Sequence, residues 1–263
     1  MTDIYESLVN TAGIQVVLTV NGKPSPEGSR KTLVIQTDDE SSLYYYEWVQ
    51  NNIRKVSEAT NGQVGYIHIP DMSAEGLNEF VKYFYPQLSK RALIIDDRGN
   101  GGGNVSPMII ERLNREMTMI NTARNTESRP GRLDMQWGPK VVLIDHYSAS
   151  DGDLFPYQFK KLKIGKAIGT TTWGGVVGIR GSLPFIDGGS LRKPEFAPYD
   201  TEGKEWIIEG KGVEPDIWIE NDPAKEYAGE DEQLNKAIEV ILEELKNWPE
   251  KLPPPPPYPD KTK

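Results

Sequence analysis

Two short, almost wholly apolar runs constrain this chain more than any other feature. Residues 92–96 (ALIID) and 140–145 (KVVLID) each precede a polar turn and a helical pattern. Apolar runs of this length are typical of strands whose sheet is covered on both faces. Because strand and helix alternate through this part, we predict an α/β sheet with crossover helices. The other expected strands are 14–20, 31–36, 64–69, 176–185 and 206–208, the expected helices are 43–60, 74–89, 105–119, 151–162 and 231–245, and 120–138 is an expected loop.

The two ends of the chain differ from this middle part. Residues 14–20 are followed by Asn21–Gly22, a strong two-residue turn signal, then by a polar loop at 24–30 and the second β-rich run at 31–36. This segment is too small to bury a core alone, since domains below about 40 residues usually need extra stabilisation. It is therefore expected to be part of something larger. At the other end, five consecutive prolines follow Leu252 and predict an extended tail.

Composition excludes several classes of protein. The net charge is −9, which argues against a nucleic-acid partner. No apolar run approaches the roughly 20 residues of a membrane helix, and the first residues show no signal-peptide pattern. The chain has no cysteine, which excludes disulfides, thiolate metal sites and a cysteine nucleophile. We predict neither a metal nor a cofactor.

A glycine-rich turn, Asp97–Arg98–Gly99–Asn100–Gly101–Gly102–Gly103, follows the first apolar run and precedes a helix. Glycines allow a tight turn and leave amide N–H groups uncovered. Such amides near a helix N-terminus suit a phosphate or the oxyanion of an acyl-transfer intermediate. A purely structural turn is the alternative. The turn lacks the Gly-Lys-Ser/Thr ending of a P-loop, and no acidic residue stands at the distance typical of dinucleotide sites.

A second motif, Tyr147–Ser148–Ala149–Ser150–Asp151–Gly152–Asp153, joins the end of the second run to the next helix. A serine there can expose its hydroxyl beside free helix amides, as a nucleophile requires. It can equally cap the helix, which is what serine most often does. Strand-end loops on one sheet edge tend to converge, so this motif and the glycine turn are expected to face each other.

A serine nucleophile needs a base, and the chain contains two histidines. His68 lies in the middle of a predicted strand and is typical of a packed residue. His146 stands four residues before Ser150, which makes it a neighbour of the nucleophile and not an obvious base.

These motifs in this order resemble the tricorn-type branch of the tail-specific protease superfamily of serine peptidases. The resemblance covers essentially the whole chain. It implies an α/β (α+β) fold, a mixed sheet with crossover helices in a ClpP/crotonase-like peptidase domain, preceded by a partial PDZ-like segment. The implied parts are 1–37 as the C-terminal part of a PDZ-like domain, 38–62 as a connecting helix, 63–247 as the catalytic domain and 248–263 as a Pro-rich tail. The matching stretches are Tyr66–Pro70, Asp97–Gly103, Ser148–Asp153, Thr172–Gly175 and Glu209–Asp216.

The resemblance also implies roles for individual residues. Ser150 matches the nucleophile. The oxyanion hole matches the amides of Asp151 and of Gly102, the latter to within one residue. Glu209 matches the acidic member of the tricorn-type tetrad, where a buried carboxylate would order the site.

One departure concerns the base. The carboxy-terminal processing branch uses a lysine, but its position here is occupied by Gly175. Lysines 160, 161, 163 and 166 surround a helix end and are expected to be solvated. The tricorn-type branch takes its base from a Ser-His pair in an upstream helical domain, and nothing in 1–263 matches that pair. We therefore expect the chain to be a fragment, or a partner to a chain that supplies the base, with little or no activity alone.

The leading prediction is a serine-type endopeptidase or oligopeptidase that cleaves peptides or unfolded protein through an acyl-enzyme on Ser150. A catalytically silent peptide-binding or assembly module of the same fold is one alternative, and a phosphate-binding α/β enzyme using residues 101–103 is another. The resemblance further implies a homo-oligomer, a hexamer in the family. It implies a cytoplasmic location, or export where a signal peptide precedes Met1.

Overall fold

The computed structural model describes residues 3, 5–181, 183–260 and 262. The chain divides at Asn51 into two compact units, and the boundary falls inside helix α1 (Ser41–Ala59). The smaller unit holds a short 3₁₀ helix, η1 (Tyr5–Leu8), and an antiparallel hairpin of β1 (Gln15–Val20) and β2 (Arg30–Ile35). The hairpin and the helix after it match the sequence prediction. The proposed PDZ-like nature of this segment stays a prediction, and residues 1, 2 and 4 of it lie outside the described part of the chain.

The larger unit is built on a five-stranded sheet in the order β11-β8-β7-β4-β3. All four strand pairs are parallel. The expected α/β fold is confirmed, but this sheet is parallel throughout and not mixed. The antiparallel pairs of the described residues lie in separate two-stranded sheets. The five strands are β3 (Val64–His68), β4 (Ala92–Asp96), β7 (Lys140–Ile144), β8 (Gly165–Gly169) and β11 (Ile217–Trp218).

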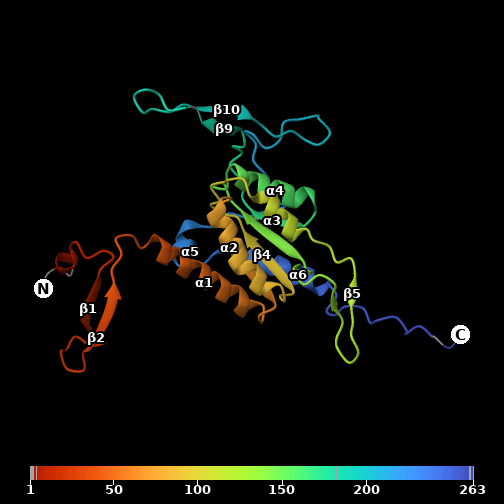
Figure 1. Cartoon of the computed structure of the whole chain (residues 1–263), viewed down its shortest axis with the longest axis horizontal. Helices are drawn as coiled ribbons and strands as arrows, with labels where there is room; N and C mark the ends of the chain where they lie inside the picture. The colour runs from red at the N-terminus through yellow and green to blue at the C-terminus, as the bar shows by residue number, and fades with distance from the viewer. Residues whose placement is uncertain (1–2, 4, 182, 261, 263) are drawn as a thin grey trace. The chain divides into compact units, whose positions relative to one another are not determined.

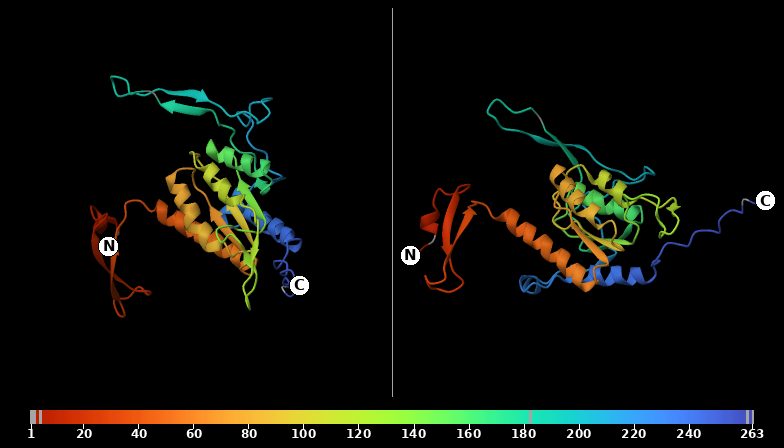
Figure 2. Two further views of the ribbon diagram at one scale, coloured as in Figure 1. Left: turned by 45° about the vertical axis from the view of Figure 1, so that its right-hand side comes forward. Right: turned by 60° about the horizontal axis from the view of Figure 1, so that its bottom comes forward.

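Helices cover both faces of this sheet (Figure 1). From β3 to β8 each strand is added on the same side of its predecessor, so right-handed crossovers place the intervening helices on one face. The blue α6 lies on the opposite side from these yellow and green helices (Figure 2). No helix among the described residues is long and apolar enough to cross a membrane. The helices of this unit are α2 (Ala74–Phe84) with the 3₁₀ turn η2 (Tyr85–Gln87), α3 (Ser106–Leu113), α4 (Asp151–Lys161), α5 (Pro223–Tyr227) and α6 (Glu232–Lys246).

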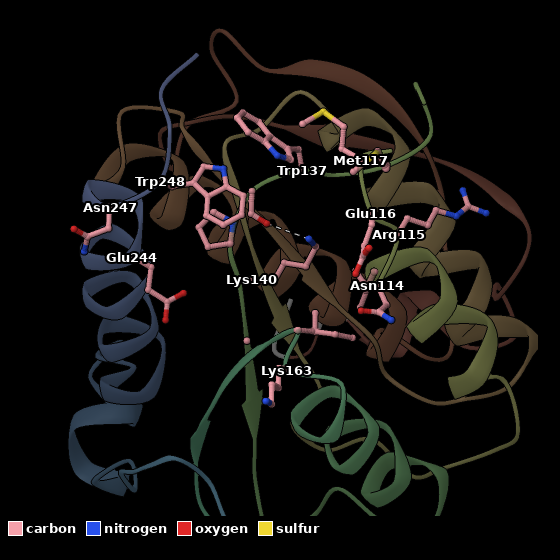
Figure 3. A pocket seen from close by; sticks show the side chains of 16 residues that line it. Asn114, Arg115, Glu116, Met117, Trp137, Lys140, Lys163, Glu244, Asn247 and Trp248 are labelled. Carbon is pink, nitrogen blue, oxygen red and sulfur yellow. Dashed lines mark hydrogen bonds between the residues drawn. The ribbon is translucent and has the colours of Figure 1, made fainter. Parts of the chain in front are cut away.

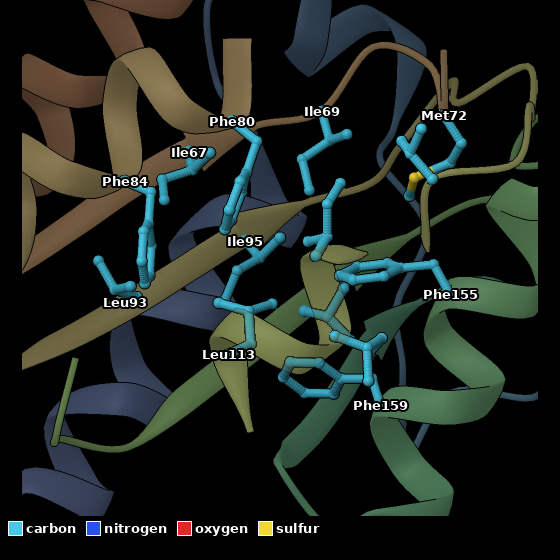
Figure 4. Packing of buried hydrophobic residues seen from close by; sticks show 14 of the residues in the cluster. Ile67, Ile69, Met72, Phe80, Phe84, Leu93, Ile95, Leu113, Phe155 and Phe159 are labelled. Atoms are coloured by element: carbon cyan, nitrogen blue, oxygen red, sulfur yellow. The ribbon is translucent and has the colours of Figure 1, made fainter. Parts of the chain in front are cut away.

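Two apolar cores explain why the central strands read as continuous hydrophobic runs. Side chains alternate along a strand, so Ile95 packs against α2, α3 and α4 while Ile94 packs against α6. On the first face, Phe80 and Phe84 stack with ring centroids 4.8 Å apart (Figure 4). All five residues of β4 and of β7 are buried. The prediction of a sheet covered on both faces is therefore confirmed.

The strand β8 was not predicted, because its sequence (GKAIG) lacks a strong β pattern. Its two glycines are required by close packing. A β-carbon at Gly165 would lie 1.8 Å from the carbonyl oxygen of Lys140, and one at Gly169 would lie 1.9 Å from that of Ile144. Proximity to β7 thus removes the side chains that would have revealed the strand.

Two further predictions were wrong in detail. Helix α3 ends at Leu113, six residues early, and the chain enters a small hairpin of β5 (Ile120–Asn121) and β6 (Arg129–Pro130) inside the expected loop. The expected strand at 206–208 is only an isolated bridge between Tyr199 and Trp206. The antiparallel pair β9 (Gly178–Gly181) and β10 (Arg192–Phe196) forms an arm that extends from the domain (Figure 1).

Candidate active site

Ser150 stands directly before α4, on the loop that follows β7. Its backbone has φ +58° and ψ −118°, a costly conformation for a residue with a β-carbon and one that clusters at functional sites. The side chain is exposed and makes no capping hydrogen bond. Helix capping therefore does not account for Ser150. In contrast, Ser148 is buried and donates to the carbonyl of Asp97 at 2.8 Å, which is a structural role.

The glycine turn packs directly against Ser150. Gly102 has φ +91°, and a β-carbon there would lie 2.6 Å from the Cβ of Ser150 and 2.8 Å from the carbonyl oxygen of Ala149. Only glycine leaves room for this approach. The loops that follow β4 and β7 thus meet, as expected for neighbouring parallel strands.

Asn100 holds these two loops together. Its buried side chain donates to the carbonyl of Ile69 at 3.0 Å and to Oδ1 of Asp97 at 2.9 Å. Its own carbonyl accepts the amide of Ala149 at 2.8 Å. A β-carbon at Gly152 would lie 2.5 Å from that same carbonyl oxygen, so the start of α4 rests on Asn100. The sequence motif contained Asn100, but its role as a link was not foreseen, because no local pattern shows which loops a side chain joins.

Three backbone amides near Ser150 differ in what they bind. The side chain of Asp151 accepts from the amide and the hydroxyl of Ser106, while the Asp151 amide donates to no described residue. The Gly102 amide donates to Oδ1 of Asn100 at 2.9 Å. The Gly103 amide has no acceptor among the described residues. The Gly102 carbonyl accepts from Met72 at 2.8 Å, so the planar trans peptide directs the Gly103 N–H away from Met72.

A buried carboxylate joins the first turn of α4 to the loop after β8. Asp153 is fully buried and accepts from the hydroxyl of Thr172, from the Gly174 amide at 2.8 Å and from the Gly175 amide at 3.2 Å. The amide of Trp173 also donates to the carbonyl of Ser148 at 3.0 Å. The nucleophile loop and the 172–175 loop therefore form one hydrogen-bonded layer.

Glu209 continues this layer on its outer side. Its Oε2 accepts the amides of Val176 and Val177 at 2.7 and 2.9 Å. The next amide, that of Gly210, donates to the carbonyl of Gly174 at 2.7 Å. Glu209 is exposed, so the expectation of a buried carboxylate was wrong. It faces main-chain donors of the segment that starts the β9–β10 arm, and none of its described hydrogen bonds reaches Ser150.

No described hydrogen bond joins a histidine or lysine side chain to the Ser150 hydroxyl. His68 ends β3, is 7% exposed, and its Nε2 lies 3.1 Å from the carbonyl of Arg98. Burial lowers the pKa of His68. His146 is exposed and packs on the ring of Tyr147 at 4.0 Å between centroids. Lys160 pairs with Asp216 at 3.1 Å, so it ties two segments together and is not simply solvated as expected.

Beneath the loops lies a carboxyl group that the motif contained but that was given no role. Asp97 is fully buried, and its Oδ2 has no hydrogen-bond partner among the described residues. Burial, together with the charges of Asp96 and Asp145, raises the pKa of Asp97 well above its ordinary value. A protonated side chain at this place bears on stability and not on proton transfer, since it contacts Asn100 and not Ser150.

Comparison with known proteins adds to this geometry. The sequence pattern of Peptidase family S41 matches residues 63–219. Over 96% of its length the chain is 42% identical to the tricorn protease of Thermoplasma acidophilum, and over 94% it is 36% identical to tricorn protease homolog 1 of Streptomyces coelicolor. In each case it spans 23% of the relative, so the chain corresponds to about a quarter of these proteins.

Solved structures of related proteins show the same similarity. A crystal structure of the tricorn protease superposes with a TM-score of 0.85 at 40% identity, covering 93% of this chain and 24% of that one. A peptidase structure from Parabacteroides merdae gives a TM-score of 0.53 at 19% identity, covering 92% of this chain and 84% of that one, and so shows a shared fold alone.

Proposed function

Because this chain belongs to peptidase family S41, we propose that it carries the nucleophile and oxyanion-binding part of a serine peptidase site. The observation that carries the proposal is the contact between Ser150 and Gly102. An exposed hydroxyl with no capping partner lies against a glycine turn beside the unpaired amide of Asp151. Such a group of donors is what acyl transfer requires next to a nucleophile.

The chemistry assigned to these residues is amide-bond cleavage in two steps. The Ser150 Oγ attacks the substrate carbonyl carbon and its proton passes to a base, while the carbonyl oxygen becomes an oxyanion. The oxyanion accepts from the Asp151 amide and from an amide of the glycine turn. Collapse breaks the C–N bond, the amine leaves with a proton, and an ester on Ser150 remains. Water then attacks this ester and releases the acid, which regenerates the hydroxyl.

The second oxyanion donor is Gly102 or its neighbour. The Gly102 amide is engaged by Asn100, so it would have to leave that bond when a substrate oxygen arrives. The Gly103 amide has no such competitor among the described residues. We favour Gly103 for this reason, within the one-residue range that the family resemblance allows.

Glu209 is assigned a positioning role. Its carboxylate fixes the two amides at Val176 and Val177, and the chain before them runs through Gly174 and Trp173 to the nucleophile loop. An exposed carboxylate can also orient a base contributed from elsewhere.

We propose that the base comes from outside residues 1–263, either from another part of a longer protein or from another chain. Gly175 occupies the lysine position, and no described hydrogen bond joins His146 to Ser150. We also propose that the substrates are peptides or unfolded proteins and that the protein assembles into a homo-oligomer. The relatives named for tricorn protease are about four times as long as this chain, so residues outside 1–263 would take part in both.

The test is phosphonylation of Ser150 with and without an added base. A fluorophosphonate probe is applied to the chain, and the labelled serine is located by peptide mass spectrometry. We expect slow labelling at Ser150, faster labelling when imidazole is added, and none in Ser150→Ala. Ser190→Ala, at an exposed serine of the arm, is the matched control and should label normally.

Two outcomes would change the proposal. Efficient peptide cleavage without imidazole, lost in Ser150→Ala, would show that the chain contains its own base. Absence of labelling at Ser150 even with imidazole, in a chain that still binds peptides, would favour the silent peptide-binding module instead.

A further inference from the structure

A cavity lies at the end of the sheet opposite Ser150, where β7 begins. It has a volume of about 760 Å³ and includes Lys140, which begins β7, whereas Ser150 follows the end of that strand. Its walls include Met117, Trp137 and Trp248, so part of the lining is flat and apolar (Figure 3). None of these residues takes part in the proposed peptidase site. A role for this cavity is therefore independent of the proposed peptidase site.

Lys140 is the charged group at the centre of this cavity. The residue is only 7% exposed, and its ammonium donates to the carbonyls of Gln136 and Gly138, both at 3.0 Å. A lysine ammonium has three donors, so one remains. None of the described ion pairs includes Lys140. A buried cation without a carboxylate partner is costly, and an anion placed beside it would relieve that cost. Burial lowers the pKa of Lys140 to about 8, so most of the population is still charged at neutral pH.

Trp248 contributes its indole ring to the wall of this cavity. Its indole Nε1 is buried and has no hydrogen-bond acceptor among the described residues. The ring contacts Trp137 edge to face, with centroids 5.7 Å apart. Together the two indoles offer an apolar wall for a planar group.

The other charges around the cavity are mostly neutralised. Arg115 pairs with Glu111 and Asp134, and Glu244 pairs with Lys166 at 3.1 Å. The exposed Glu116 and Lys163 occur in no described ion pair, and Figure 3 shows Glu116 across the cavity from Trp248. Glu116 is therefore the one carboxylate of the lining that can compete for Lys140.

We propose that this cavity is a binding site for a small monocarboxylate with a flat apolar body. The carboxylate pairs with the ammonium of Lys140, and the body packs against Trp137 and Trp248. The apolar wall sets the shape of the ligand, and the single buried cation sets its charge.

Phenylacetate is a suitable probe, and phenylacetamide is the matched control because it has the same body and no charge. The measurement is a ¹H–¹⁵N spectrum of the tryptophan indole groups of the whole chain, with Trp248→Phe used to assign the resonance of Trp248. We expect phenylacetate to shift this resonance saturably below about 10 mM. Phenylacetamide should bind at least about tenfold more weakly, a difference of about 1.4 kcal/mol.

Substitutions at Lys140 and Glu116 test whether the Lys140 ammonium binds the carboxylate of the ligand. Lys140→Met should weaken phenylacetate binding at least about tenfold, Lys140→Arg should retain most of it, and Glu116→Gln should strengthen it. Equal affinity for phenylacetate and phenylacetamide, or no saturable shift at Trp248, would overturn the proposal. That comparison uses the unsubstituted chain, so it decides the matter even where Lys140→Met does not fold.

Discussion

The α-carbon of Gly102 lies against Ser150 so closely that a β-carbon at position 102 would stand 2.6 Å from the Cβ of the serine. The proposed nucleophile and the glycine turn are thus fitted to each other by the absence of a side chain. This relationship joins the ends of β4 and β7 and places the exposed hydroxyl beside free amides.

Gly102→Ala should move the nucleophile loop. The new methyl group would overlap Ser150, and the backbone at φ +91° is unfavourable for alanine. We expect fluorophosphonate labelling of Ser150 to slow by about tenfold or more, which corresponds to at least about 1.4 kcal/mol. Gly101→Ala is the control, since a β-carbon there would meet nothing within 4 Å. Equal labelling rates in the two variants would contradict the proposed contact.

Asp153→Asn should weaken the layer that joins α4 to the 172–175 loop. The carboxylate accepts three donors, from Thr172, Gly174 and Gly175. An amide would turn an NH₂ group toward at least one of them. We expect the free energy of unfolding in urea to fall by about 2–3 kcal/mol. Asp187→Asn, at an exposed turn where the carboxylate accepts from Gly189 alone among the described residues, should change it by less than about 0.5 kcal/mol.

The pH dependence of stability should report on Asp97. Its raised pKa means that the folded chain keeps the proton while the unfolded chain loses it above about 3.8. Stability from this group is therefore present at low pH and declines as pH rises toward the folded-state pKa, by up to about 1.4 kcal/mol per pH unit. Asp97→Asn cannot ionise. From pH 4 to 7 its unfolding free energy should improve steadily relative to the unsubstituted chain, and a constant difference would show that Asp97 is ionised in the fold.

Lys140 should change the pH dependence of stability in the opposite direction to Asp97, and at higher pH. Its pKa of about 8 lies below the ordinary 10.5, so between these values the unfolded chain binds the extra proton. Stability should rise with pH across this window, by about 3 kcal/mol in total. Lys140→Met should lack this rise in chemical denaturation, whereas Lys163→Met, at an exposed position of the same cavity, should keep it. A similar rise in Lys140→Met would place its origin elsewhere.

Much of the fold could be predicted from the sequence, because the hydrophobic pattern is strongest in the strands whose residues are all buried. The apolar runs at β4 and β7 are typical of a covered sheet, and the two polar motifs that follow them were expected to converge at one edge. The strand β8 escaped prediction because close packing had replaced its side chains with glycine. Helix α3 was predicted too long, since apolar residues beyond Leu113 continue the helical spacing but enter a hairpin instead.

The candidate site was predictable in part. Ser150 and the glycine turn follow from local motifs, whereas Glu209 was named from family resemblance and its exposure could not be foreseen. The links made by Asn100 and Asp153 depend on contacts between distant segments, which no local pattern encodes. The geometry of such polar links follows from the packed fold and not from the spacing of residues in the chain.

The most direct test of the central claim is a crystal structure of the chain treated with a peptide boronate, which forms a tetrahedral adduct with a nucleophilic serine. We expect boron bonded to the Oγ of Ser150, with a boronate oxygen about 2.7–3.1 Å from the Asp151 amide nitrogen. An adduct on another hydroxyl, or a boronate oxygen directed away from both Asp151 and the 101–103 turn, would contradict the assignment of this edge of the sheet as a peptidase site.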